Sequence, residues 1–132
     1  MKEEIKKLAK HRLSRSRSTL EEGEALLNQG FFSGSVNRFY YAAFYAAKAV
    51  FAIKNLDSSK HSGAIALFNE HFVRTGIIDK DVAKAFSRSF ERRQDSDYED
   101  FSFPTEKEAA SLKDQVEAFI DACEKIFKES FK

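Results

Sequence analysis

Apolar residues recur every three or four positions along most of this chain, the spacing that places them on one side of an α-helix. The pattern predicts five helices, near residues 3–29, 33–55, 59–75, 79–98 and 105–128. No stretch shows the strict alternation of apolar and polar residues that is typical of a half-buried strand. The connections are short, which favours antiparallel neighbours. The sequence therefore predicts an all-α protein, an up-and-down helical bundle of about five helices.

Residues that favour helix ends support these boundaries. Gly30 and Gly76 are expected to stop the first and third helices in a left-handed conformation. Thr105 and Glu108 have the spacing of a capping box, directly after Pro104. The other expected starts fall on short polar residues: Ser33 or Ser35 for the second helix, Ser58 and Ser59 for the third, and Asp79 for the fourth.

The second helix is apolar or small on nearly every side, which places it at the centre of the bundle. With 132 residues the chain has the length of one domain, residues 1–132. Its 14 Phe and single Pro favour helices with a bulky core. The expected core residues are Phe39, Val50, Phe51, Phe68, Phe86, Leu112 and Phe119.

In the fourth helix an apolar stripe ends in charge. Val82, Phe86 and Phe90 mark one face, and the next positions on that face are Arg93 and Asp97. A guanidinium in such a place needs Asp97, a partner chain or an anionic ligand, because an unpaired buried charge is very costly. The simpler alternative is that the helix leaves the core at its last turn and Arg93 is solvated.

The second helix carries a polar ridge at helical spacing. Asn37, Tyr41, Tyr45 and Lys48 follow one another along it, with Arg38 beside them. One interpretation is that the Tyr rings pack while their hydroxyls reach solvent. The other is a groove formed by Asn37, Arg38, Tyr41 and Arg93 that binds a phosphate or a base, because Arg offers a forked donor set and Tyr stacks on bases.

Charged residues are distributed unevenly along the chain. Residues 1–20 hold seven Lys or Arg against two Glu, whereas residues 91–108 hold seven acidic residues against three basic ones. The basic start of the chain is either a phosphate-binding face or a solvated helix face.

The sequence predicts a cytoplasmic protein. It has one Cys, no apolar run long enough to span a membrane and no secretory signal. The three His lack metal-site spacing, so no metal and no cofactor are expected.

Three segments carry a resemblance. Residues 37–44 (NRFYYAAF), 59–63 (SKHSG) and 93–98 (RQDSDY) resemble the HEPN domain family, in its small stand-alone branch. The resemblance implies a helical bundle related to the helical domain of kanamycin nucleotidyltransferase, usually a homodimer and often encoded beside a minimal nucleotidyltransferase. Many members are ribonucleases or toxins of toxin-antitoxin pairs. Their motif is an Arg, four to six intervening residues and a His, which cuts RNA without metal.

This chain departs from that motif where the His is expected. The residues at the three allowed spacings from Arg93 are Tyr98, Glu99 and Asp100. The obvious group for proton transfer near neutral pH is therefore missing. By resemblance the candidate catalytic residues are Arg93, with Asp97 orienting it, and Tyr98. The candidate nucleotide- or RNA-binding residues are Asn37, Arg38, Tyr41, Lys48 and His61.

Three functions follow from these observations. The first is a dimeric HEPN-like module that binds a nucleotide or RNA and works with a nucleotidyltransferase partner. The second is a metal-independent ribonuclease toxin, in which Tyr98 or His61 replaces the missing His. The third is a structural helical adaptor whose Arg93 and Asp97 pair only with each other. The sequence leaves open whether the protein is an enzyme, and which RNA, nucleotide or partner it binds.

Overall fold

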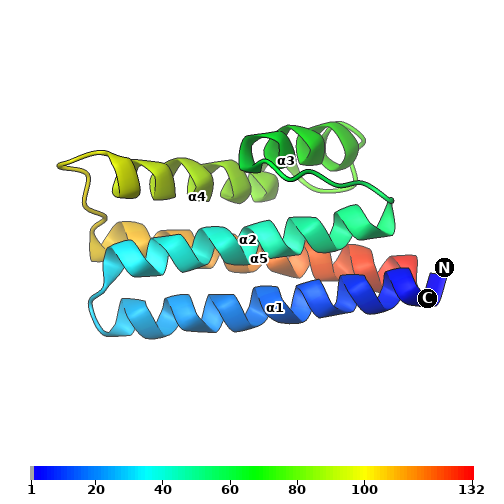
Figure 1. Ribbon diagram of the computed structural model, residues 1–132, viewed down its shortest axis with the longest axis horizontal. Coiled ribbons are helices and arrows are strands. Elements are labelled where there is room, and N and C mark those ends of the chain that lie inside the picture. The colour runs from blue at the N-terminus through cyan, green and yellow to red at the C-terminus, as the bar shows by residue number, and fades with distance from the viewer. Residues whose placement is uncertain (1) are drawn as a thin grey trace.

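Four long helices run side by side in alternating directions (Figure 1). The computed structural model describes residues 2–132, and no strand occurs among them. The α1–α2 and α4–α5 connections lie at one end of the bundle, and the two chain ends at the other. The predicted all-α up-and-down bundle is confirmed. The helices are α1 (Lys2–Asn28), α2 (Phe32–Ile53), α3 (His61–Phe68), α4 (Lys80–Tyr98) and α5 (Glu106–Ser130), and a π-helical turn, η1 (Asn69–Val73), follows α3 directly.

Helix α2 occupies the centre and packs against α1, α4 and α5. Gly23 of α1 allows the Phe39 ring of α2 to pack close to the α1 backbone, because a Cβ atom there would lie 2.5 Å from that ring. The buried Ser16 hydroxyl of α1 donates to the Ala42 carbonyl of α2 at 2.6 Å. Although α2 is the most apolar of the long helices, neither it nor any other helix among the described residues is long and apolar enough to cross a membrane.

Aromatic rings from four helices, α2, α3, α4 and α5, and from the π-helical turn form the core. Phe68 at the end of α3 lies 5.1 Å from Phe119 of α5 and 5.9 Å from Phe86 of α4, measured between ring centroids. Phe72 of η1 stacks on Phe68 at 5.0 Å. All seven core residues predicted from the pattern are buried: Phe39, Val50, Phe51, Phe68, Phe86, Leu112 and Phe119.

The helix boundaries agree with the predicted caps in most places. Gly30 and Gly76 adopt positive φ angles of 83° and 76°. Asp79 accepts hydrogen bonds from the amides of residues 81 and 82, and the Thr105–Glu108 capping box is complete.

Helix α2 begins at Phe32, one residue before the predicted Ser33. The predicted caps of the third helix were wrong. Neither Ser58 nor Ser59 caps α3, which begins after Lys60 without a side-chain cap. The Ser58 hydroxyl instead donates to the Lys60 carbonyl at 3.1 Å, so it serves the connection that leads to the helix.

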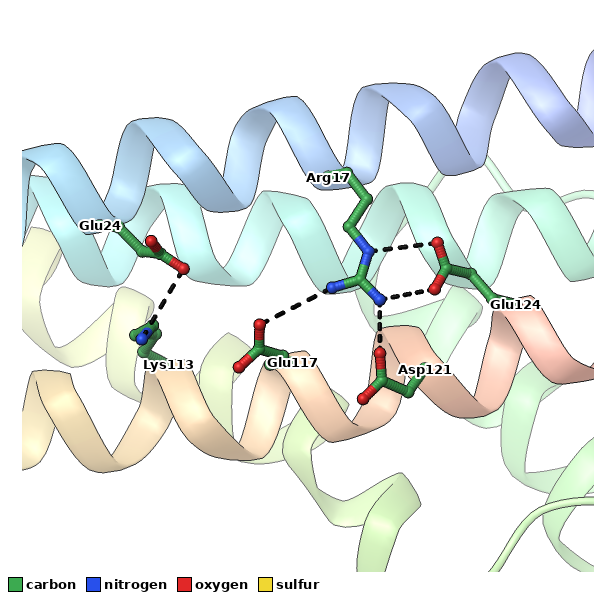
Figure 2. Close-up of polar contacts among 6 residues, drawn as sticks. All are labelled: Arg17, Glu24, Lys113, Glu117, Asp121 and Glu124. Atoms are coloured by element: carbon green, nitrogen blue, oxygen red, sulfur yellow. Dashed lines mark hydrogen bonds and ion pairs between the residues drawn. The ribbon is translucent and has the colours of Figure 1, made fainter.

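Charged side chains join α1 to α5. The Arg17 guanidinium of α1 is bound by three carboxylates of α5, those of Glu117, Asp121 and Glu124 (Figure 2). The hydrogen bond with Glu124 is the main cause that raises the pKa of Arg17 above its usual value. Lys113 and Glu24 form a further ion pair at 3.7 Å. Arg17, one of the seven basic residues near the start of the chain, is thus engaged within the fold.

Candidate functional site

Arg93 turns its side chain from α4 toward α2. Its guanidinium carbon lies 5.6 Å from the ring centroid of Tyr40 and 5.3 Å from that of Tyr41. Its Nε lies 3.1 Å from Oδ2 of Asp97, one turn further along α4, and the Arg93 side chain is only 16% exposed. Packing against two rings and an ion pair at i+4 together hold this charge at the edge of the core.

Two polar atoms at this place have no hydrogen-bond partner among the described residues. They are Nε of Arg93, which faces Asp97 at an unfavourable angle for a hydrogen bond, and Oγ of Ser96. Both atoms are buried. Since buried polar atoms are nearly always paired, two such atoms three residues apart on one helix make this turn of α4 the candidate site. Sequence reasoning missed Ser96, and its i+3 spacing from Arg93 was the available signal.

His61, the first residue of α3, joins the same cluster. Its Nδ1 lies 2.5 Å from the hydroxyl of the fully buried Tyr40. Its ring lies 4.6 Å from that of Phe44 and edge-on to Tyr41 at 5.7 Å. The segment between α2 and α3 therefore brings His61 to the rings that Arg93 covers. The hydrogen bond between Tyr40 and His61 was not predicted.

The environment fixes the protonation of this pair. Burial raises the pKa of Tyr40 above its usual range, so its hydroxyl keeps the proton. Burial, followed by the charge of Arg93, lowers the pKa of His61, so the imidazole is neutral at pH 7. The Tyr40 hydroxyl then donates to Nδ1, and the remaining imidazole proton is on Nε2. Arg93, Ser96 and this form of His61 all offer hydrogen-bond donors, a set that suits an anion.

The other predicted residues are spread more widely. Asn37 accepts hydrogen bonds from Nε and Nη2 of Arg38 at 3.2 and 2.9 Å. The Arg38 guanidinium carbon lies 5.2 Å from the ring centroid of Tyr41, which joins these residues to the Arg93 cluster. Lys48 is engaged elsewhere, with Asp57 and with the Ser58 carbonyl. Tyr98 ends α4 and is 75% exposed.

The titration of His61 provides a direct check of this electrostatic picture. We expect its pKa, followed by NMR, to lie below the usual value of 6.5 and to rise when Arg93→Ala removes the neighbouring charge. As the pH falls below about 6.5, the unfolded chain takes up this proton before the folded protein does, so the free energy of unfolding decreases. His61→Gln removes this contribution. A pKa above 6.5 would contradict the assigned hydrogen bond, because a protonated imidazole cannot accept from Tyr40.

Comparison with known proteins identifies the family. The model of the HEPN domain matches residues 9–126. The chain belongs to the HEPN domain family. A UPF0332 protein of Thermotoga maritima is 37% identical over 129 residues, which cover 96% of both chains. Two proteins of Methanocaldococcus jannaschii, each named a putative toxin, are 36% and 32% identical; the matches cover 83% of this chain and 81% and 71% of theirs. The predicted membership of the small stand-alone HEPN branch is confirmed.

Proposed function

We propose that this HEPN protein is a homodimeric module that binds RNA or a nucleotide at Arg93. The observation that carries the proposal is the buried, aromatic-packed guanidinium of Arg93, whose Nε and the neighbouring Ser96 hydroxyl lack hydrogen-bond partners among the described residues. A phosphate oxygen would satisfy both groups, and the Nε2 proton of His61 is a further donor for it. Tyr41, partly exposed beside them, offers a ring on which a base stacks.

The relatives that are named putative toxins support a cellular role for this module. We propose that it is the toxin-like member of a toxin-antitoxin pair, whose other member is a minimal nucleotidyltransferase. Expression of the chain alone should then arrest bacterial growth, and co-expression of its proposed partner, a minimal nucleotidyltransferase, should restore growth. Equal growth in both cases would favour the adaptor function instead.

We propose a dimer that joins two copies near the Arg93 end of α4. Tyr98, Phe101 and Phe103 expose 75%, 94% and 71% of their surface there, and large exposed rings close together favour association. A two-fold axis at this end would bring the two Arg93 side chains toward each other.

Binding without cleavage is favoured by the chemistry of the site. The neutral His61 already accepts a hydrogen bond from Tyr40 at Nδ1, so it offers the ligand a donor rather than a free basic nitrogen. The phenol of Tyr98 is a poor replacement for the motif His, because imidazole is the side chain suited to proton transfer near neutral pH.

The test measures the fluorescence anisotropy of two labelled probes, single-stranded RNA and ATP, in the presence of the purified protein and a chelator. Light scattering measures the mass of the protein in solution. We expect saturable binding, a dimeric mass and intact RNA. Binding of neither ligand would contradict the proposed function. Cleaved RNA in the chelator would instead support the ribonuclease function.

A further inference from the structure

A second pair of a cation and an aromatic ring lies along α2, outside the Arg93 site. The guanidinium carbon of Arg15, on α1, lies 4.2 Å from the ring centroid of Tyr45 on α2. Arg15 is exposed, and no carboxylate pairs with it among residues 2–132. Arg17, two residues later, is bound by three carboxylates. The fold thus neutralises one arginine of α1 and leaves its neighbour charged, with free donors, over a ring.

This pair continues the Arg93 site without a gap. The rings of Tyr45 and Tyr41 lie 6.2 Å apart, and the guanidinium groups of Arg38 and Arg93 lie 5.2 and 5.3 Å from Tyr41. Two neighbouring rings on α2, flanked by cations at both ends, therefore lie along one face of this helix, which lies between α1 and α4 (Figure 1). The row consists of Arg15, Tyr45, Tyr41, Arg38 and Arg93.

The row extends beyond Tyr45 toward the end of α2. Arg12 of α1 donates from Nη1 to the Lys48 carbonyl at 2.8 Å, and the Lys48 ammonium lies 5.9 Å from the Phe44 ring. Arg12, like Arg15, forms no ion pair with a carboxylate in the described part of the chain. Since the Lys48 ammonium is paired with Asp57, the positive charge beyond the Arg15–Tyr45 pair comes from Arg12.

The chemistry of such a row matches single-stranded nucleic acid. Its phosphates repeat along the backbone with a base beside each one, and proteins bind it with basic groups that follow the backbone and rings on which bases stack. Tyr41 and Tyr45 are four residues apart, which is a rise of about 6 Å along the helix. A free nucleotide bound at Arg93 would occupy only the Tyr41 end.

We propose that Arg15 and Tyr45 form a second subsite, which extends the Arg93 site along α2 and favours single-stranded RNA over a free nucleotide. The inference rests on the proposed function, because it assumes that Arg93 binds a phosphate. Arg15 binds the next phosphate of the strand and Tyr45 stacks on the next base. At least two consecutive nucleotides of a single RNA strand therefore bind to this face of α2.

The test compares two probes, ATP and a single-stranded oligoribonucleotide of about eight nucleotides, a length within the usual range of site sizes. We expect Arg15→Gln and Tyr45→Leu each to weaken oligonucleotide binding about tenfold and to leave ATP binding unchanged. Arg93→Ala should weaken both. Arg88→Gln is the matched control: Arg88 is an exposed arginine on α4 that bonds Gln115 of α5, and this variant should change neither affinity.

Salt dependence separates the roles of the two residues. The slope of log K against log salt for the oligonucleotide should become shallower by about 0.7 in Arg15→Gln, because one phosphate contact is lost. Tyr45→Leu should keep the wild-type slope, since stacking releases no counterions. This comparison decides the matter even where ATP binds too weakly for its affinity to be measured. Circular dichroism melts of all variants confirm that they are folded.

The other possible results contradict either the proposed function or the proposed subsite. Failure of the wild type to bind either probe removes the proposed function itself. Loss of binding only in Arg93→Ala, with unchanged affinity and slope in the Arg15 and Tyr45 variants, leaves that function standing and assigns the pair to packing between α1 and α2. Equal weakening of both probes by Arg15→Gln would also reject the subsite. A dimeric wild type that becomes monomeric in Tyr45→Leu would show that a second copy covers this face.

Discussion

Phe86→Ala should lower the free energy of unfolding by about 3 to 5 kcal/mol, the largest effect we expect from a single substitution in this protein. Phe86 is 1% exposed and belongs to α4. Its ring lies 5.7 Å from Phe119 of α5, 5.9 Å from Phe68 of α3 and 6.3 Å from Tyr40 of α2. Alanine would leave a cavity where four helices meet, and rings held by separate helices cannot all move in to fill it.

Urea denaturation followed by circular dichroism measures this loss. Phe31→Ala is the matched control, because Phe31 is 58% exposed, lies outside the proposed dimer contact and loses the same atoms. Its effect should stay below about 1 kcal/mol. A loss near zero for Phe86→Ala would contradict the assigned role of α4 in the core.

Most of the fold could be predicted from the sequence because each long helix carries a local signal. The apolar stripe of α4, the small and apolar surface of α2 and the Thr105–Glu108 capping box can all be recognised within a few residues of sequence. The segment around α3 was less predictable. It was expected as one helix over residues 59–75, but the structure has a helix of eight residues and then a π-helical turn. Such a short helix depends on the packing of Phe68 and Phe72 rather than on its own caps.

The candidate site also has contacts that the sequence predicts and contacts that it does not. The pairing of Arg93 with Asp97 follows from their i+4 spacing on one helix, and it was among the partners predicted for Arg93. The hydrogen bond between Tyr40 and His61 joins residues 21 positions apart, and the Arg15–Tyr45 contact joins two helices. Side-chain contacts of this kind depend on how neighbouring helices are rotated, which periodicity does not determine.

The proposed site makes a second strong prediction. Arg93→Ala should weaken the binding of RNA or nucleotide by roughly 1.5 to 3 kcal/mol, a factor of about 10 to 150 in Kd, which is the scale of hydrogen bonds to a charged group. Stability should change much less. The Asp97 side chain that loses its partner is 34% exposed, so water can solvate the carboxylate.

Two further variants separate charge from geometry in this prediction. Arg93→Lys keeps the positive charge but loses the planar fork, so its affinity should lie between those of the wild type and the alanine variant. Arg88→Ala, on the same helix but facing Gln115 of α5, should bind as the wild type does. Affinities come from fluorescence anisotropy, and a circular dichroism melt of each variant verifies its fold.

The result also distinguishes the three functions considered for the chain. Normal binding by Arg93→Ala, or its unfolding, would show that Arg93 mainly anchors α4 through Asp97 and the rings of Tyr40 and Tyr41, as the adaptor function requires. Cleavage of RNA by the wild type in a chelator, absent in Arg93→Ala, would establish a ribonuclease that works without the motif His. Weakened binding with intact RNA and an intact fold is the outcome that we expect, because the buried donors at Arg93 and Ser96 lack acceptors among the described residues that a phosphate would provide.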